Sequence, residues 1–313
     1  MKRVLCGVLL FVTTTLGSGA WADSESGRIV FTSSRTGNWE LWTANPDGSN
    51  LVQLTHSPEE KHSPAWSPNG AKIAYSTNTG GIWVRDAGGG NGEKVSLGHR
   101  NCDHPAWHPD GKHLVFVAYE IQGPGKEDSE IWQVELNGEG WNKPTKLFSL
   151  EGLEVYPAWA PQGRKVAFSR FHRGLRDEVV EEIWIRDLAT DSPVEITRTG
   201  ADNIQVAWSP AGEALAFTSD LAGNYDVWVL GLKQGYLKKL TEALAYDGEP
   251  CWSADGTRIA FVSTRSGSKK IWMMKSDGSD PTPLTSGPGD DKNPCWSRTG
   301  RQSNEPEKAQ TGR

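Results

Sequence analysis

One seven-residue pattern returns along the chain and constrains the fold more than any other feature. It reads Pro-Ala-Trp-Ser-Pro-Asn-Gly at residues 64–70, and each later copy keeps the tryptophan and the final glycine. The tryptophans are separated by 41, 52, 49, 44 and 44 residues, at Trp66, Trp107, Trp159, Trp208, Trp252 and Trp296. A period in the forties with a fixed aromatic residue and a fixed turn is typical of repeat architectures, in which each copy is one supersecondary unit.

The residues of each copy favour four short strands. In Ser67-Pro68-Asn69-Gly70, proline presets φ, asparagine suits the third position and glycine closes a β-turn. An apolar triplet of period two follows and predicts a strand, at 73–75, 114–116, 166–168, 215–217 and 259–261. An aliphatic-tryptophan pair marks the next strand, at 82–83, 131–132, 183–184, 227–228 and 271–272. A further strand is predicted to end near 196–197, 240–241 and 284–285.

The two ends of the repeat region complement each other. Residues 28–31, 40–42 and 51–55 supply the second, third and fourth strands of a unit that lacks its first, and residues 294–300 supply only a first strand. Pairing the two ends closes a ring and removes its free edges. We therefore predict an all-β fold, a six-bladed β-propeller of four-stranded blades over residues 23–300, closed by the N- and C-terminal strands in one blade. The polar segment 301–313 is predicted to be a disordered tail.

Residues 1–22 have the features of a secretory signal peptide. Lys2 and Arg3 precede the apolar run 4–16, and Ala20-Trp21-Ala22 matches a cleavage signal. We expect cleavage after Ala22 and a periplasmic or secreted protein. The apolar run is short for a transmembrane segment, and none is predicted elsewhere.

Charge and cysteine content narrow the function further. Without Lys2 and Arg3, 31 basic residues face 39 acidic ones, so the net charge of −8 argues against nucleic acid as a partner. Three cysteines remain, an odd number that excludes a fully paired disulfide framework. Cys251 and Cys295 occupy a position that is alanine in four other copies, so we interpret them as small packing residues rather than a disulfide.

The repeat resembles that of TolB-type propellers. The shared elements are Pro-Ala-Trp-Ser-Pro-x-Gly, Ile-Ala-Phe, Ile-Trp, Leu-Thr, and an Asp-Gly-Ser turn at 47–49 and 277–279. The resemblance covers about residues 28 to 300. It implies a periplasmic protein of a Tol–Pal-type envelope system that binds a peptidoglycan-associated lipoprotein through its propeller. Only residues 23–27 separate the expected cleavage site from the first strand, so we expect the additional N-terminal domain of TolB proteins to be absent.

The loops between the second and third strands vary in length, and function tends to lie on variable loops. From the aromatic residue of one strand to the tryptophan of the next, the six distances are 11, 8, 16, 16, 11 and 11 residues. The two long insertions, 118–130 and 169–182, lie in neighbouring blades. The second carries a basic cluster that could contact an anionic ligand or partner, or could be a solvated loop balanced by nearby acids. Its residues are Arg170, Phe171, His172, Arg173 and Arg176.

Residues just before each first strand should converge on the channel mouth of the propeller. The candidates are His62, Asp103, His104, Glu154, Tyr156, Asn203, Gln205, Asp247, Glu249, Asp291 and Asn293. This set could bind a divalent cation, a polar ligand or peptide, or only ordered water. His62, His104 and Gln205 are the nearest candidates for metal ligands. A second group, His99, Cys102, Asp103 and His104 with His108 nearby, lacks the ligand spacing of a zinc site.

The sequence contains no G-x-S-x-G nucleophile elbow and no H-E-x-x-H motif, so we assign no catalytic residues. We predict a monomeric, non-catalytic module without a cofactor that binds an envelope protein or peptide. The alternative is a metal-dependent lyase or hydrolase acting on an acidic polysaccharide at the channel mouth. The basic loop and the channel-mouth histidines motivate this alternative, together with a resemblance to oligogalacturonate lyases, which use a metal at that place. A third interpretation is a purely structural repeat protein.

Overall fold

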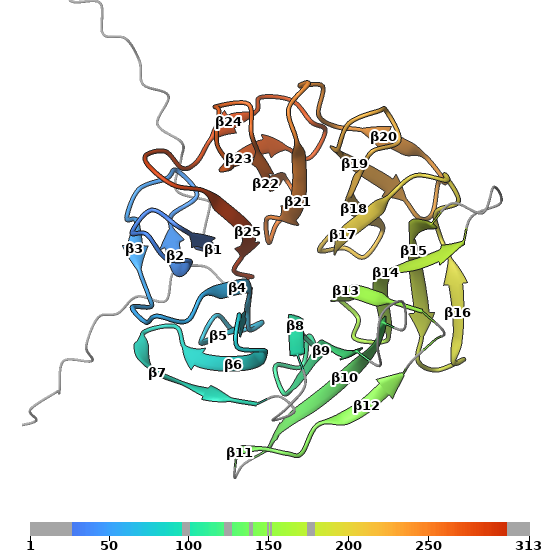
Figure 1. Cartoon of the computed structure of the whole chain (residues 1–313). Helices are drawn as coiled ribbons and strands as arrows, with labels where there is room; N and C mark the ends of the chain where they lie inside the picture. The colour runs from blue at the N-terminus through green and yellow to red at the C-terminus, as the bar shows by residue number, and fades with distance from the viewer. Residues whose placement is uncertain are drawn as a thin grey trace, which may run out of the picture.

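A computed structural model describes residues 27–95, 101–121, 127–137, 140–148, 150, 152–173 and 179–298. The predicted signal peptide and the predicted tail lie outside this range. Six antiparallel sheets are arranged radially around one axis, which confirms the all-β six-bladed propeller (Figure 1). In the described part of the chain, no helix has the length and apolar character needed to cross a membrane.

The blades are numbered by the order of their innermost strands around the ring. Blade 1 contains β25 (Asp291–Trp296), β1 (Ile29–Ser33), β2 (Glu40–Ala44) and β3 (Val52–Gln53). Blade 2 contains β4 (Lys61–Trp66), β5 (Lys72–Thr77), β6 (Gly81–Asp86) and β7 (Gly89–Lys94). Blade 3 contains β8 (Asn101–Trp107), β9 (His113–Ile121), β10 (Glu127–Asn137), and an outer strand divided into β11 (Gly140–Trp141) and β12 (Thr145–Phe148).

The remaining three blades have four strands each. Blade 4 contains β13 (Glu154–Trp159), β14 (Lys165–Arg173), β15 (Val179–Asp187) and β16 (Ser192–Glu195). Blade 5 contains β17 (Asn203–Trp208), β18 (Ala214–Ser219), β19 (Asp226–Gly231) and β20 (Leu237–Lys239). Blade 6 contains β21 (Asp247–Trp252), β22 (Arg258–Ser263), β23 (Lys270–Lys275) and β24 (Thr282–Pro283).

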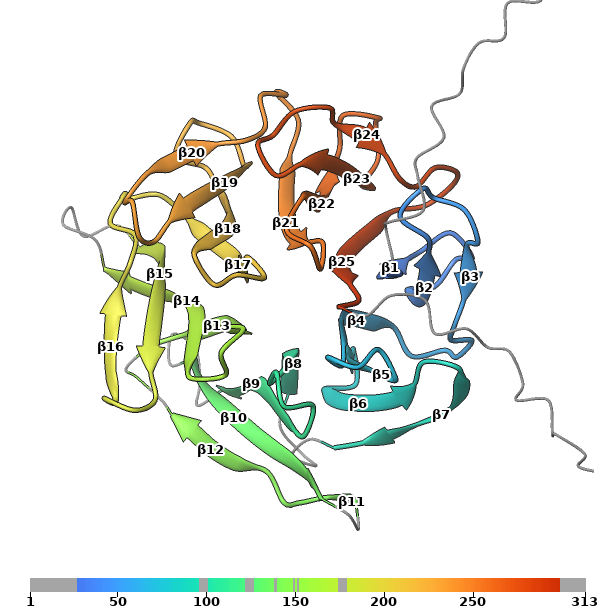
Figure 2. The same ribbon diagram turned by 180° about the vertical axis from the view of Figure 1, so that it is seen from behind.

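Blade 1 is built from both ends of the chain, as predicted. Strand β25 pairs antiparallel with β1, with Ile29 opposite Trp296 (Figure 2). Beyond the strands, Arg28 N donates to Ser297 Oγ at 2.8 Å, and Ser297 N donates to Arg28 O at 2.8 Å. Because the first and last strands share one ladder, the ring has no open gap between its first and last blades.

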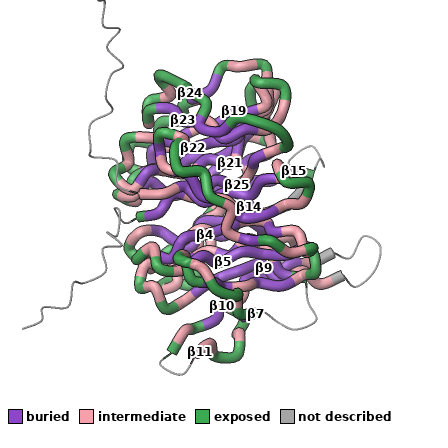
Figure 3. The backbone as a smooth tube through the Cα atoms, turned by 90° about the vertical axis from the view of Figure 1, so that its left-hand side faces the viewer, coloured by how far each residue is buried: buried purple, intermediate pink, exposed green. Residues whose placement is uncertain are grey.

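The core lies between the blades, and the rims of the ring carry most of the exposed residues (Figure 3). The second strands of five blades each contribute a fully buried aromatic residue, at Phe31, Phe116, Phe168, Phe217 and Phe261. Five of the six repeated tryptophans of the first strands are buried, and Trp252 is half-buried. Trp107 Nε1 donates to Ala65 O of the preceding blade at 3.2 Å and Trp208 Nε1 donates to Ala158 O at 3.1 Å, so these two side chains join neighbouring blades as well as filling space. Cys251 and Cys295 are free thiols.

The outermost strands end earlier than the sequence predicts, by one or two residues. The expected end at 196–197 lies beyond β16, and the ends at 240–241 and 284–285 lie beyond β20 and β24. A threonine hydroxyl takes the place of the next ladder bond: Thr197 Oγ1 accepts from Ile183 N at 2.8 Å. The same contact recurs at Thr55, Thr241 and Thr285. The Leu-Thr signal therefore marks a side-chain cap of the third strand.

Candidate functional site

Every innermost strand contains a β-bulge, and one residue at each bulge has a left-handed backbone. In blade 2, for example, the register shifts between His62 and Ala65. The six residues have φ between 47° and 57° and are Ser63, His104, Tyr156, Gln205, Glu249 and Asn293. Such φ values are uncommon for residues other than glycine, and bulges redirect side chains. In five of the six positions the next residue is proline, which cannot donate a ladder bond.

These six bulges surround one cavity of about 180 Å³ on the propeller axis. We call this place the axial mouth. Its lining consists of the six left-handed residues and the residue after each, namely Pro64, Pro105, Pro157, Val206, Pro250 and Pro294. Residues held in such sparsely populated conformations cluster at binding sites, so the ring of bulges is the first candidate for a functional site.

On one side of the axial mouth, side-chain oxygens connect one blade to the next. Gln205 Oε1 accepts from Glu249 N at 3.2 Å. Glu249 Oε2 accepts from Asn293 N at 2.5 Å, and Asn293 Oδ1 accepts from Ser63 N at 3.4 Å. This chain of bonds runs from blade 5 through blades 6 and 1 to blade 2. We call these four residues the bonded half of the mouth.

The bonded half contains an acid, Glu249, that is half-buried. Burial raises the pKa of Glu249, and the N–H of Asn293 with the charges of Lys269 and Lys292 opposes this effect only in part. Burial also lowers the pKa of Lys292, whose Nζ lies 4.1 Å from the centroid of the Trp39 ring. Both shifts have the same cause, because burial disfavours the charged form of either group.

The other side of the axial mouth is formed by the rings of His104 and Tyr156, and Tyr119 contacts His104 without lining the cavity. The centroids of His104 and Tyr156 are 4.2 Å apart, and Tyr119 Oη lies 3.5 Å from His104 Nδ1. Burial lowers the pKa of His104, and the charge of Asp103 opposes this effect only in part. Burial raises the pKa of Tyr156 above its ordinary value. We call His104, Tyr156 and Tyr119 the aromatic half; at neutral pH its imidazole and phenols carry no charge.

Five of the predicted mouth residues line the cavity: His104, Tyr156, Gln205, Glu249 and Asn293. His62 and Asp103 each precede a lining residue. Asp103 Oδ1 accepts from Ser76 Oγ at 2.5 Å and from His104 N at 2.7 Å. Burial alone would raise the pKa of Asp103, but the charge of His104 and these hydrogen bonds lower it. Burial, helped by the charge of Lys292, lowers the pKa of His62.

The other four predicted residues, Glu154, Asn203, Asp247 and Asp291, do not line the cavity, which corrects the expectation that they would. They lie two residues before the left-handed position, and their side chains are fully buried. Each carboxylate faces an arginine, at 3.0 Å for Asp291–Arg35, 3.8 Å for Glu154–Arg170 and 2.7 Å for Asp247–Arg265. Arg35 and Arg265 lie two residues beyond the second strand of their blade, and Arg170 lies within β14. The three guanidinium groups also lie over Trp42, Trp184 and Trp272, at 4.9, 5.0 and 4.8 Å. The motif is a repeated packing contact between strands.

The basic cluster of the second insertion is only partly described. Arg170 belongs to the buried contact with Glu154, and Phe171 is half-buried on β14. The side chains of His172 and Arg173 and all of Arg176 lie outside the described residues. Both insertions were predicted as loops, but they are largely strands. β9, β10, β14 and β15 have 9, 11, 9 and 9 residues, whereas the inner strands of the other blades have five or six.

Of the three predicted metal ligands, His104 and Gln205 line the axial mouth, and His62 precedes the lining residue Ser63. Gln205 Oε1 also accepts from Thr218 Oγ1 at 2.8 Å, so it is occupied by bonds between blades. Within the described ranges, the single group of three His, Cys, Asp or Glu residues with ligand atoms in mutual reach lies elsewhere, at the turn after β8. His99, from the second predicted group, lies outside the described residues. Ser63 was missed, although its place before Pro-Ala-Trp matches that of His104 and Tyr156.

Comparison with known proteins agrees with this geometry. The model of the TolB beta propeller domain matches residues 24–174 and 140–304. The TolB homolog of Chlorobium chlorochromatii is 30% identical over 144 residues, which cover 45% of this chain and 30% of that protein. The chain thus spans about a third of the length of this curated relative.

Solved structures share the fold. TolB from Acinetobacter baumannii superposes with a TM-score of 0.76 and 24% identity, covering 88% of this chain and 67% of that one. An oligogalacturonate lyase in complex with manganese has a TM-score of 0.58 and 14% identity, covering 82% of this chain and 73% of that one. The family match spans nearly the whole repeat, and the chain therefore belongs to the TolB beta propeller domain family.

Proposed function

We propose that the chain is a monomeric, non-catalytic binding module of the bacterial cell envelope, which takes a protein or peptide partner of a Tol–Pal-type system at the axial mouth. Family membership supports an envelope role, and the signal peptide predicted at residues 1–22 supports the periplasm as its place. The additional domain of TolB proteins is not needed for this role, because the proposed partner contacts the propeller.

The observation that carries the proposal is the aromatic half of the mouth. His104, Tyr156 and Tyr119 offer rings with polar ends, the type of side chain that dominates protein interfaces. They belong to blades 3 and 4, which also carry the two longest hairpins, β9–β10 and β14–β15. A cavity beside two long hairpins gives a partner a place to insert one anchoring side chain and a further surface to contact on the hairpins.

The chemistry of the aromatic half fits a neutral or weakly polar anchor. The imidazole of His104 is neutral near pH 7 because burial lowers its pKa. The basic residues Arg173 and Arg176 of the second hairpin would extend contact to an acidic segment of the partner. Their role stays a prediction.

A metal-dependent lyase or hydrolase acting on an acidic polysaccharide is the second candidate. The observation in its favour is a neutral imidazole, His104, beside the ionised Asp103 at an axial cavity, an arrangement able to accept a proton. The likeness to the manganese-bound lyase is one of fold alone. No group of three His, Cys, Asp or Glu ligands stands at the axial mouth among the described residues, so this candidate ranks second.

A pull-down of envelope proteins with the mature chain, run with and without a divalent-metal chelator, tests both candidates. We expect the wild type to retain a specific envelope partner in chelator, and the Tyr156→Ala variant to lose it. Tyr236→Ala is the matched control, because Tyr236 is 47% exposed and lies before β20 at the outer edge. Retention by the Tyr156→Ala variant would contradict the assigned surface. Cleavage of an acidic polysaccharide that stops in chelator would support the enzyme.

A further inference from the structure

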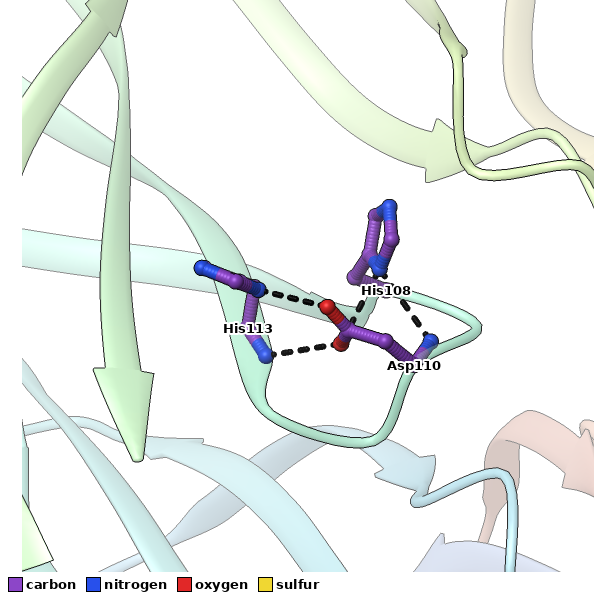
Figure 4. Close-up of side chains that lie close together, drawn as sticks. All are labelled: His108, Asp110 and His113. Carbon is purple, nitrogen blue, oxygen red and sulfur yellow. Dashed lines mark hydrogen bonds and ion pairs between the residues drawn. The ribbon is translucent and has the colours of Figure 1, made fainter. Parts of the chain in front are cut away.

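The turn after β8 brings two imidazoles and a carboxylate together (Figure 4). Asp110 Oδ1 lies 3.0 Å from His108 Nδ1, and Asp110 Oδ2 lies 2.7 Å from His113 Nδ1. One ligand atom from each of the three residues lies within 4.8 Å of the other two. Their side chains are 20%, 33% and 33% exposed for His108, Asp110 and His113, so an ion can reach them from solvent.

We propose that His108, Asp110 and His113 form a binding site for one divalent transition-metal ion of the zinc class. Two imidazole nitrogens and one carboxylate oxygen are a common protein ligand set for zinc, with a fourth position left for water. Imidazole ligands favour zinc, copper or nickel over calcium or magnesium, which prefer oxygen.

The other blades show that the turn does not need these residues to fold. In blade 2 the corresponding positions are Ser67, Asn69 and Lys72, and Ser67 Oγ accepts from Lys72 N at 2.9 Å. In blade 6 they are Ser253, Asp255 and Arg258, with the equivalent bond at 3.0 Å. Blades 4 and 5 also lack histidine there, with Ala160, Gln162, Lys165 and with Ser209, Ala211, Ala214. Of these five blades, only blade 3 has histidine at both the first and the last of the three positions. The imidazoles are therefore not required for the turn to form.

The second nitrogen of each imidazole faces an acceptor that could hold the ring in place. His108 Nε2 lies 2.9 Å from Gly163 O in the next blade, and His113 Nε2 lies 4.0 Å from Glu135 Oε1 on β10. A carbonyl or carboxylate behind each ligating histidine is the usual arrangement around protein-bound metals, because it fixes the tautomer that leaves the other nitrogen free. With its proton on Nε2, His108 accepts a hydrogen bond at Nδ1 from Asp110 N at 3.1 Å, and an ion bound to this nitrogen would replace that bond.

The approach of His108 to the next blade depends on a glycine. A Cβ added to Gly163 would lie 2.5 Å from His108 Nε2, so a larger residue there would displace the ring. The carboxylate of Asp110 is also fixed in place, because its Oδ1 accepts from Lys112 N at 2.8 Å and from His113 N at 3.1 Å. The site is therefore prearranged by three elements: the turn itself, β10 and the turn of blade 4.

This site is separate from the axial mouth. His104 lies at the bulge in the middle of β8, whereas His108 follows the last residue of that strand, Trp107. The two proposals can therefore be tested separately. Loss of metal binding at the turn would leave partner binding at the axial mouth intact, and loss of partner binding would leave metal binding intact.

The test uses tag-free mature protein freed of metal and titrated with zinc by isothermal calorimetry, with cobalt absorption as a second readout. We expect one zinc ion per chain, and binding about 10-fold weaker or more in either His108→Ser or His113→Lys. These variants copy blade 2, so the turn should still fold, and their melting without metal checks this. His56→Gln, at an exposed histidine elsewhere, is the matched control and should bind as the wild type does.

Two results would overturn the proposal. One is the absence of stoichiometric zinc binding to the wild type. The other is unchanged affinity in both His108→Ser and His113→Lys, or loss of binding only in His104→Gln, which would place the ion at the axial mouth.

Discussion

The bonded half and the aromatic half of the axial mouth have the same backbone and different uses. Gln205, Glu249 and Asn293 have the same positive φ and the same bulge as His104 and Tyr156. In the bonded half, a side-chain oxygen of each of these three residues accepts from the main-chain N–H of the next blade. In the aromatic half, the corresponding side chains meet ring to ring. A polar residue at a propeller mouth is thus not by itself evidence of a ligand site.

This difference follows from side-chain chemistry at one repeated position. An amide or carboxylate oxygen can reach the neighbouring N–H and satisfy a buried donor, which would otherwise be costly. An imidazole or phenol at the same position fills space and presents a ring. The bonded half and the aromatic half therefore share one backbone arrangement and differ only in the type of side chain at the repeated position.

The largest expected effect comes from breaking the bonded half at the closing strand. Deleting all residues after Gly287 removes β25, and with it the pairing with β1 and the Asn293 link. We expect the deletion variant to lose a cooperative thermal transition when its melting is followed by circular dichroism. The reason is that β1 becomes an open edge and blade 6 loses its neighbour. An unchanged cooperative melt would show that closure is not required.

A smaller but still large effect is expected from the packing tryptophans. Trp159→Ala, behind the aromatic half, should lower the free energy of unfolding by about 3–5 kcal/mol, the usual range for a buried large aromatic residue. Trp252→Ala, at the half-buried equivalent in blade 6, should cost less. Urea denaturation of both variants measures the difference, and equal losses would contradict the burial argument.

The two halves should respond to acid with opposite signs. The pKa of Glu249 is raised in the folded protein, so its contribution to stability is present below its ordinary pKa of 4.5 and is lost as pH rises through the folded value. The pKa of His104 is lowered, so its contribution is present above its ordinary pKa of 6.5 and is lost as pH falls through the folded value.

Unfolding free energies of Glu249→Gln and His104→Gln, measured from pH 4 to 9, test these signs. Acidification should stabilise the wild type through Glu249, and Glu249→Gln should lack this gain in unfolding free energy. Acidification should destabilise the wild type through His104, and His104→Gln should lack this loss. The same pH dependence in both variants would show that burial does not control both groups.

The smallest expected effect separates stability from binding. Asn293→Ala removes two side-chain hydrogen bonds between blades, one from Ser63 N and one to Glu249 Oε2, and should cost about 2 kcal/mol in unfolding free energy, with partner retention unchanged. Tyr156→Phe keeps the ring contact with His104 and should leave stability unchanged. A pull-down and a denaturant titration on each variant would reveal whether the bonded half also takes part in binding.

Most of the scaffold could be predicted from local patterns. The turn Ser67-Pro68-Asn69-Gly70, the apolar triplets and the incomplete first and last copies predicted six blades and their closure, because period, turn chemistry and strand alternation act over a few residues. The site was harder. His104, Tyr156, Gln205, Glu249 and Asn293 were placed correctly on the cavity, but Glu154, Asn203, Asp247 and Asp291 were not.

The sequence by itself determined the ring, since each repeat encodes its own strands and turns. Only the tertiary structure decided which polar residues face the axis. A bulge adds one residue to a strand and reverses the face of every residue beyond it, so a position two residues away, such as Asp291, turns into the blade. The tertiary structure also decided the surroundings of His108 and His113, because Gly163 and Glu135 reach them from other turns and strands. Such contacts depend on how blades pack, and no local pattern carries that information.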